Sequence, residues 1–266
     1  MSDIPFDRAA LERQTRSMVF DTPAGTVPGL SERGHRVYRR QVRLSVKNGV
    51  KLAIPIARKL LGKKTIEAIL DRWLNENPPE TRLYWELPLQ FAVWFAARYD
   101  EGAFADLNLP VAAPELMHWE CVEVAAINAP DGPSDDPDAI NAVDLSNLEI
   151  HDQPADDRKV VLHPSARLGV FRHPVHRISL KDAAWPEASD VPFCVLVYRP
   201  TGEEYAAWME LDPVTAQALA QAAEGKTLAE CRAFLAELHG AAVPWDALLA
   251  RLDTLRERGA ILGYAA

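Results

Sequence analysis

A proline- and aspartate-rich segment divides the chain into two parts with different sequence patterns. Residues 129–158 read APDGPSDDPDAINAVDLSNLEIHDQPADDR, a composition that is typical of linkers and long loops. A metal site among these acids is the alternative, but the EF-hand spacing, with its central Gly and closing Glu, is absent. We therefore expect one domain at 1–128, an acidic linker at 129–158 and a second domain at 159–266.

The part before this segment shows the apolar periodicity of α-helices. Spacings of three and four predict one helix with Tyr38, Val42, Val46, Gly49, Leu52 and Ile56 on a face, and a second with Ile66, Ile69, Leu70, Trp73 and Leu74. Pro55 predicts a kink or an end of the first helix, and Asn77-Pro78-Pro79 predicts the end of the second. Two later helices are expected to present Phe91, Trp94 and Phe95, and Met117, Cys121, Val124 and Ala125. No strand is needed before about residue 128, so we expect a small helical bundle.

The part after the segment alternates short strands with compact helices. Strands are predicted at 160–162, 168–171, 193–198, 204–211 and 261–264, with a hairpin turn at 199–202. Asp212-Pro213 opens one helix, a capping box of Thr227 and Glu230 opens the next, and Pro244 opens the third. A hairpin with three short helices has the size and content of a winged-helix module. The predicted fold class is therefore α+β.

Charge is distributed unevenly along the chain. Residues 31–72 hold twelve Lys and Arg against three acids, whereas residues 101–157 hold fourteen Asp and Glu and neither Lys nor Arg. The basic stretch favours nucleic-acid binding, but the whole molecule, with a net charge of −9, would be repelled by a polyanion. Pairing of the basic helix with the acidic helix and linker explains the same charges without nucleic acid.

The sequence offers little sign of catalysis in this chain. The P-loop, GxGxxG, HExxH and GxSxG motifs are absent. The three cysteines (Cys121, Cys194 and Cys231) are far apart, which fits buried thiols in a reducing cytoplasm, with a reactive thiol as the alternative. A secretory signal and an apolar run of about 18 residues are both missing, so we expect a cytoplasmic chain outside the membrane.

Two groups of titratable residues leave alternatives open. His173 and His176 could share a metal ion, but Pro174 breaks the helical spacing and the flanking arginines would repel a cation. Anchoring a loop or contacting a partner is the favoured interpretation of these histidines. Glu120 and Glu123 lie one helical turn apart and could place two carboxylates together, although solvation or pairing with the basic helix explains them as well.

The stretch from Tyr38 to Phe95 resembles a known bacterial family. It reads YRRQVRLSVKNGVKLAIPIARKLLGKKTIEAILDRWLNENPPETRLYWELPLQFAVWF: an apolar helix up to a Pro, Leu-Leu-Gly, a second helix, Asn-Pro-Pro, and an aromatic–acidic–apolar–Pro step into Gln-Phe. Together with PELMHWE at 114–120, VLHPSARLGVFRHPVHRI at 161–178 and VLVYR at 195–199, this order resembles the HvfC family, which includes MbnC and TglI. The resemblance covers roughly residues 6–262, with weak helix formers at 46–49 as a departure.

Members of that family form heterodimers with TIM-barrel oxidases that carry two or three iron ions, and the complexes modify cysteines of ribosomally made peptides. The resemblance therefore implies a non-catalytic subunit that binds the leader of a precursor peptide. It implies no cofactor in this chain, because the iron belongs to the partner oxidase. It also implies a helical partner-binding domain at 1–128 and a winged-helix-like peptide-recognition domain at 159–266.

Strand addition at the exposed edge of the second-half hairpin is the expected mode of leader binding. The candidate peptide-binding residues are Tyr198, Arg199, Tyr205, Trp208 and Arg251, although Tyr198 and Trp208 could instead fill the core. Aromatic and Arg side chains are enriched at interface hot spots. The candidate partner-interface residues are Tyr84, Trp85, Glu86, Arg172, His173 and His176. No catalytic or metal-ligating residue is assigned.

Two other functions compete with this prediction. A DNA-binding transcriptional regulator would use the basic helix at 36–64, but its Lys and Arg fall on nearly every helical face instead of one stripe. A stand-alone enzyme would require a catalytic motif that the sequence does not show. We therefore expect a peptide-binding partner subunit without a nucleic-acid partner.

Overall fold

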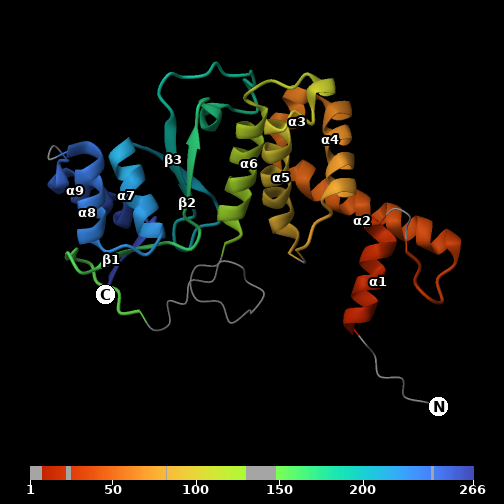
Figure 1. Ribbon diagram of the computed structural model, residues 1–266, viewed down its shortest axis with the longest axis horizontal. Coiled ribbons are helices and arrows are strands. Elements are labelled where there is room, and N and C mark those ends of the chain that lie inside the picture. Colours follow the sequence, from red (N-terminus) through yellow and green to blue (C-terminus); the bar gives the residue numbers. More distant parts are fainter. Residues whose placement is uncertain (1–7, 22–24, 82, 130–147, 241–242) are drawn as a thin grey trace, which may run out of the picture. The chain divides into compact units, whose positions relative to one another are not determined.

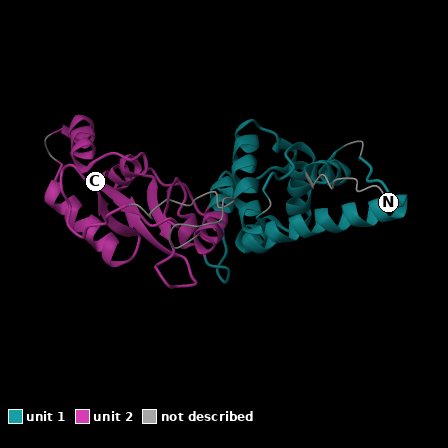
Figure 2. Ribbon diagram, turned by 90° about the horizontal axis from the view of Figure 1, so that it is seen from below, with its two compact units in different colours: residues 1–118, 179–185 teal, residues 119–178, 186–266 magenta. Residues whose placement is uncertain are grey.

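The computed structural model describes residues 8–21, 25–81, 83–129, 148–240 and 243–266. The chain forms two compact units, one of residues 1–118 with 179–185 and one of residues 119–178 with 186–266 (Figure 2). The division falls inside helix α6 (Ala113–Ile127). Most of the linker predicted at 129–158 lies in residues 130–147, outside the described part, so the predicted domain boundaries stay predictions.

The described residues of the first unit form helices and no strand (Figure 1). The helices are α1 (Arg8–Phe20), α2 (Glu32–Ala53), α3 (Pro55–Leu61), α4 (Lys63–Glu76), α5 (Leu87–Asp100) and the beginning of α6, with short 3₁₀ helices η1 (Tyr84–Glu86) and η2 (Ala105–Leu107). α2 packs against α1 and α5, and α4 packs against α3 and α5. The α+β class predicted for the whole chain is confirmed, because the second unit adds the strands.

The helix boundaries of the first unit follow local sequence signals. The Ser31 side chain accepts a hydrogen bond from the amide of Gly34 and caps α2. Pro55 occupies the first turn of α3, which confirms the predicted break after α2. The apolar stripe of α4 is fully buried, and its Trp73 meets the ring of Phe91 on α5 edge-on at 5.4 Å between centroids.

Two expectations for this unit are corrected. Leu52 is 74% exposed, whereas Val50 and Ala53 are buried. The buried stripe of α2 continues from Gly49 to Ala53, four residues later, and not to Leu52, three residues later. Because successive residues of an α-helix are rotated by about 100°, Leu52 then faces solvent. Helix α1 is not among the helices predicted from the sequence, because few apolar residues mark its face, although its Met18 and Val19 are buried.

The second unit combines two small antiparallel sheets with helices. β1 (Lys159–Leu162) pairs with β5 (Ile261–Ala265). β2 (Arg167–Phe171), β3 (Phe193–Tyr198) and β4 (Ala207–Leu211) form a sheet with β3 in the centre. The helices are α7 (Pro213–Ala223), α8 (Leu228–His239), α9 (Trp245–Glu257), the short η3 (Val175–Arg177) and the end of α6. Each predicted strand is present, and the cap at Asp212 and the capping box of Thr227 and Glu230 are confirmed.

The two faces of the β2–β3–β4 sheet have different neighbours (Figure 1). One face packs on α7, α8 and α9, and Leu196, Tyr198, Met209 and Leu211 belong to that core. Side chains alternate between the faces of a strand. Trp208 and Glu210 therefore point to the opposite face, where Trp119 in the middle of α6 meets Phe171 of β2 edge-on at 5.9 Å between centroids.

Candidate functional site

Strand β4 is an edge of the three-stranded sheet, and among the described residues only β3 pairs with it. Arg251 of α9 donates a hydrogen bond from Nη2 to the main-chain oxygen of Glu210 at 3.0 Å, so this oxygen points away from β3. Main-chain groups of an antiparallel strand point to alternate sides at successive residues. Trp208, two residues earlier, therefore also directs its N–H and C=O away from β3. The outer edge of β4 can accept an added strand beside α9.

Two of the five residues predicted to bind a peptide, Trp208 and Arg251, lie at this edge, and a third, Tyr205, precedes β4 in the chain. Trp208 on β4 is 42% exposed, and Tyr205 in the connection before β4 is 57% exposed. Arg251 already touches the edge through its guanidinium group. Aromatic rings and a cation thus accompany the exposed main-chain groups, and these are the side chains that dominate the energetics of protein interfaces.

The other two predicted peptide-binding residues point elsewhere. Tyr198 is 3% exposed and belongs to the core under α7, α8 and α9; burial raises the pKa of its hydroxyl group. Of the two alternatives for Tyr198, its position agrees with the one in which it fills the core. The Arg199 side chain donates a hydrogen bond to the main-chain oxygen of Ala129. Neither Tyr198 nor Arg199 therefore belongs to the candidate peptide site.

An aromatic cluster packs against Trp208 of β4 on the face of the sheet opposite to α7, α8 and α9. The ring of Trp208 lies 6.2 Å from that of Trp119 and 5.2 Å from that of His176, between centroids. His176 also contacts the ring of Phe193 at 5.4 Å. The two ring contacts of Trp208 are nearly perpendicular, an arrangement that is favourable beyond the area that the rings bury. The outer edge of β4 is therefore held in place before any strand is added, which lowers the entropic cost of binding.

His176 also holds the side chain of Glu210. Its Nε2 lies 2.8 Å from Glu210 Oε1, and Arg177 Nη2 lies 2.6 Å from the same oxygen. These contacts, that of His176 foremost, hold the pKa of Glu210 below its usual range. The side chain of His176 is fully buried, and His173 is 5% exposed. The predicted assignment of both histidines to a partner surface is therefore corrected, because the fold encloses their side chains, whereas Arg172 is exposed.

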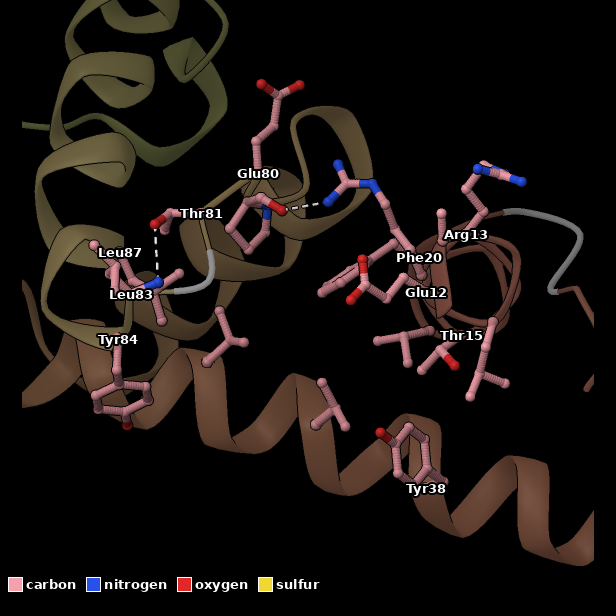
Figure 3. A pocket seen from close by; sticks show the side chains of 17 residues that line it. Glu12, Arg13, Thr15, Phe20, Tyr38, Glu80, Thr81, Leu83, Tyr84 and Leu87 are labelled. Atoms are coloured by element: carbon pink, nitrogen blue, oxygen red, sulfur yellow. Dashed lines mark hydrogen bonds between the residues drawn. The ribbon is translucent and has the colours of Figure 1, made fainter. Parts of the chain in front are cut away.

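The first unit contains a groove of about 800 Å³ between α1, α2 and the segment 79–87 (Figure 3). Leu11, Tyr38 and Tyr84 at this groove are each at least 40% exposed. Concave apolar surfaces of this size are typical of binding sites. The groove is lined by Ala9, Leu11, Glu12, Arg13, Thr15, Arg16, Val19, Phe20, Tyr38, Val42, Val46, Pro79, Glu80, Thr81, Leu83, Tyr84 and Leu87.

Tyr84 crosses α2 at one end of this groove. A Cβ atom at Gly49 would stand 2.7 Å from Cζ of Tyr84, and the Tyr84 hydroxyl donates a hydrogen bond to the main-chain oxygen of Ser45 at 3.0 Å. The ring thus explains a weak helix former at Gly49. The neighbouring Trp85 is 43% exposed, and Glu86 accepts a hydrogen bond from the hydroxyl of Thr81. The three predicted interface residues of η1 therefore sit at the groove or next to it.

Replacing Gly49 by alanine is expected to have opposite components. Alanine favours the helix by about 1 kcal/mol, but the new methyl group must displace the Tyr84 ring. We expect the full gain in stability in the Tyr84→Ala background and a smaller gain when Tyr84 is present, because the ring must then move. A double-mutant cycle of urea unfolding measures this coupling. Equal effects of Gly49→Ala in both backgrounds would contradict the packing described.

The basic charges of α2 find partners inside the first unit. Lys47 lies 3.1 Å from Glu67 and 2.7 Å from Asp71, and Lys51 lies 2.7 Å from Glu67. Both acids belong to α4, so the expected pairing with the acidic helix and linker is wrong for these two lysines. Cations held in this way are less available to a nucleic acid, which weakens the DNA-binding alternative.

Three residues organise the β4 edge but are not among the site residues predicted from the sequence: Trp119, Phe193 and Glu210. The period-two alternation of 207–211, with Trp208 and Glu210 on one face, was the available signal for Glu210. Trp119 gave no such signal, because a tryptophan on an apolar helix is ordinarily a core residue.

The described residues contain no group of three or more His, Cys, Asp or Glu side chains that could hold a metal ion. Within the same ranges, no helix combines the length and apolar character that a membrane crossing requires. All three cysteines are free thiols. Comparison with known proteins finds no family model and no curated protein that matches this chain.

Proposed function

We propose that this chain is the non-catalytic partner subunit of a multinuclear iron oxidase with a TIM-barrel fold. In this role it binds the leader of a ribosomally made precursor peptide, so that the oxidase can modify cysteine in that peptide. The observation that carries the proposal is the outer edge of β4, with Arg251 on the oxygen of Glu210 and an exposed Trp208. The resemblance of the sequence to the HvfC family supplies the reaction class, and the three free cysteines support a cytoplasmic location.

The leader adds to β4 as a further strand of the β2–β3–β4 sheet. Its main-chain groups pair with the N–H and C=O of Trp208, and one leader N–H takes the Glu210 oxygen from Arg251. The released guanidinium of Arg251 then pairs with an acidic side chain of the leader. The sheet followed by α7, α8 and α9 supports a winged-helix-like module, in which α9 forms the wall beside the added strand.

The oxidase binds to the first unit at the groove between α1, α2 and segment 79–87. Tyr84 lines this groove and is 48% exposed, and a rigid aromatic side chain at a groove is a frequent interface hot spot. The next residue, Trp85, is 43% exposed. Arg172, exposed in the second unit, remains a candidate contact. The iron ions and the reaction chemistry are assigned to the oxidase, and this chain contributes docking surface alone.

Co-expression with a TIM-barrel iron oxidase encoded beside this gene tests the proposal. We expect an iron-containing complex with both chains after affinity purification and gel filtration. Tyr84→Ala, which removes an exposed ring that lines the groove, should weaken it by about tenfold or more, as expected of a hot-spot residue. Val93→Ala is the matched control, because Val93 is 58% exposed on α5 of the same unit but does not line the groove. A chain that stays alone, or equal losses for both variants, would refute the assignment.

A further inference from the structure

A second pocket of the first unit is lined by cations. It has a volume of about 470 Å³ and lies where α3 is followed by α4 (Figure 1). Lys51, Arg58, Lys59 and Lys63 line it, together with a single carboxylate, that of Glu67. Apolar side chains complete the wall, and a partly apolar environment strengthens the interaction between the cations and any anion that enters.

The positive charges of this pocket exceed the negative ones. Glu67 is shared between Lys51 and Lys47, a lysine outside the pocket. In the described ranges of the chain, Arg58, Lys59 and Lys63 form no salt bridge with a carboxylate. The four cations and one carboxylate therefore leave three positive charges uncompensated around one cavity.

Two of these cations are held in position by neutral acceptors. Arg58 donates a hydrogen bond from Nη1 to the main-chain oxygen of Lys51 at 2.8 Å. Lys59 donates from Nζ to the main-chain oxygen of Leu180 at 2.8 Å. A carbonyl oxygen orients a cation without cancelling its charge. The guanidinium and ammonium groups thus keep their charge and have further N–H donors that a ligand can use.

The start of α4 adds to the same excess of positive charge. Gly62 precedes the helix without a side-chain cap, and Lys63 and Lys64 stand in the first turn, where no acid is present. The N-terminal end of a helix carries a partial positive charge and favours anions over cations. Lysines at this position are therefore unfavourable unless an anion compensates them.

We propose that this pocket binds a compact oxyanion of the phosphate type with two or more negative charges. Cations from α2, α3 and the start of α4 converge on one cavity, and a tetrahedral polyanion can accept hydrogen bonds from several directions at once. An extended acidic peptide would instead require cations spread along a line. This site is separate from the β4 edge and from the groove at Tyr84. The proposal of an oxyanion site does not depend on the proposed function.

Calorimetric titration of the full chain with inorganic pyrophosphate, at an ionic strength kept constant with sodium chloride, tests the site. We expect saturable binding that Lys63→Gln weakens about tenfold, as the loss of a charge-assisted hydrogen bond predicts. Lys64→Gln removes the same charge from the same helical turn but does not line the pocket, so it should change the affinity less than twofold. Both lysines are exposed, so both variants should fold.

Parallel titrations with inorganic phosphate and with a nucleoside triphosphate distinguish the sources of the oxyanion. Tighter binding of the nucleotide than of pyrophosphate would assign the pocket to a nucleotide phosphate, and weaker binding would assign it to a free phosphate. Absence of saturable binding of all three at millimolar concentration would overturn the proposal. So would equal losses in the two lysine variants, or a poly-glutamate peptide that binds more tightly than pyrophosphate.

Discussion

Replacing Trp119 by alanine should destabilise the second unit by about 3–5 kcal/mol, the range for large aromatic side chains in cores. Trp119 is 2% exposed, and its ring meets those of Phe171, His176 and Trp208 at 5.8–6.2 Å between centroids. Its removal leaves a cavity behind β4 and frees the Trp208 ring. Chemical unfolding followed by circular dichroism measures the loss.

A control variant separates this effect from the mere loss of a tryptophan. Trp85→Ala removes a ring that is 43% exposed, and we expect a stability change within about 0.5 kcal/mol. Trp119→Phe should recover part of the stability, because a phenyl ring restores some of the lost packing. A loss below about 1 kcal/mol for Trp119→Ala would mean that the aromatic cluster does not support β4.

Replacing Glu123 by glutamine should stabilise the protein at pH 8 by about 3 kcal/mol. Burial raises the pKa of the Glu123 carboxyl group on α6 from 4.5 to about 7. Between pH 4.5 and about pH 7, the Glu123 carboxyl group therefore stays protonated in the folded state but is ionised in the unfolded state. Stability falls as the pH rises through this window, and glutamine, which does not ionise, removes that loss.

Urea unfolding of both proteins from pH 4.5 to pH 8 checks the sign of this effect. The difference between Glu123→Gln and the unchanged chain should be small at pH 4.5, grow up to about pH 7 and then stay constant. Burial of His118 lowers its pKa, but this contribution is common to both proteins and cancels in the difference. A difference that is independent of pH would show that Glu123 ionises normally when folded.

The local elements of this fold were predictable because their signals are local. Asp212 caps α7, Thr227 and Glu230 form the capping box of α8, and Pro55 separates α2 from α3. Each depends on residues within a few positions of one another, where main-chain hydrogen bonding and the fixed φ of proline decide the outcome.

The burial of side chains was less predictable, because it depends on segments far apart in the sequence. His176 looks like a surface residue because Arg177 follows it in the sequence, yet Trp119 and Trp208 enclose it. The solvated interpretation of Glu120 is wrong for the same reason, since this residue is 3% exposed. One wall of the groove comes from α1, whose sparse apolar residues gave no periodic signal.

The candidate site was predicted in part. Trp208 and Arg251, predicted from a β-rich segment and a helix, lie at the outer edge of β4, and Tyr205 is exposed in the connection before it. Whether a side chain on such a strand faces the core or the edge depends on the pairing register. The pairing of Tyr198 with Ala207 places Tyr198 towards the helices, and a hydrophobic run of six residues, 193–198, could not reveal this orientation.

Amide hydrogen exchange at Trp208 tests the central claim most directly. The probe is a synthetic leader from the short cysteine-bearing reading frame beside this gene, added in excess to the full chain. Docking of the leader as a strand predicts that exchange of the Trp208 N–H slows by at least about tenfold, while amides of the groove at 83–87 keep their rates. A leader that binds and leaves the Trp208 amide unprotected would contradict the account.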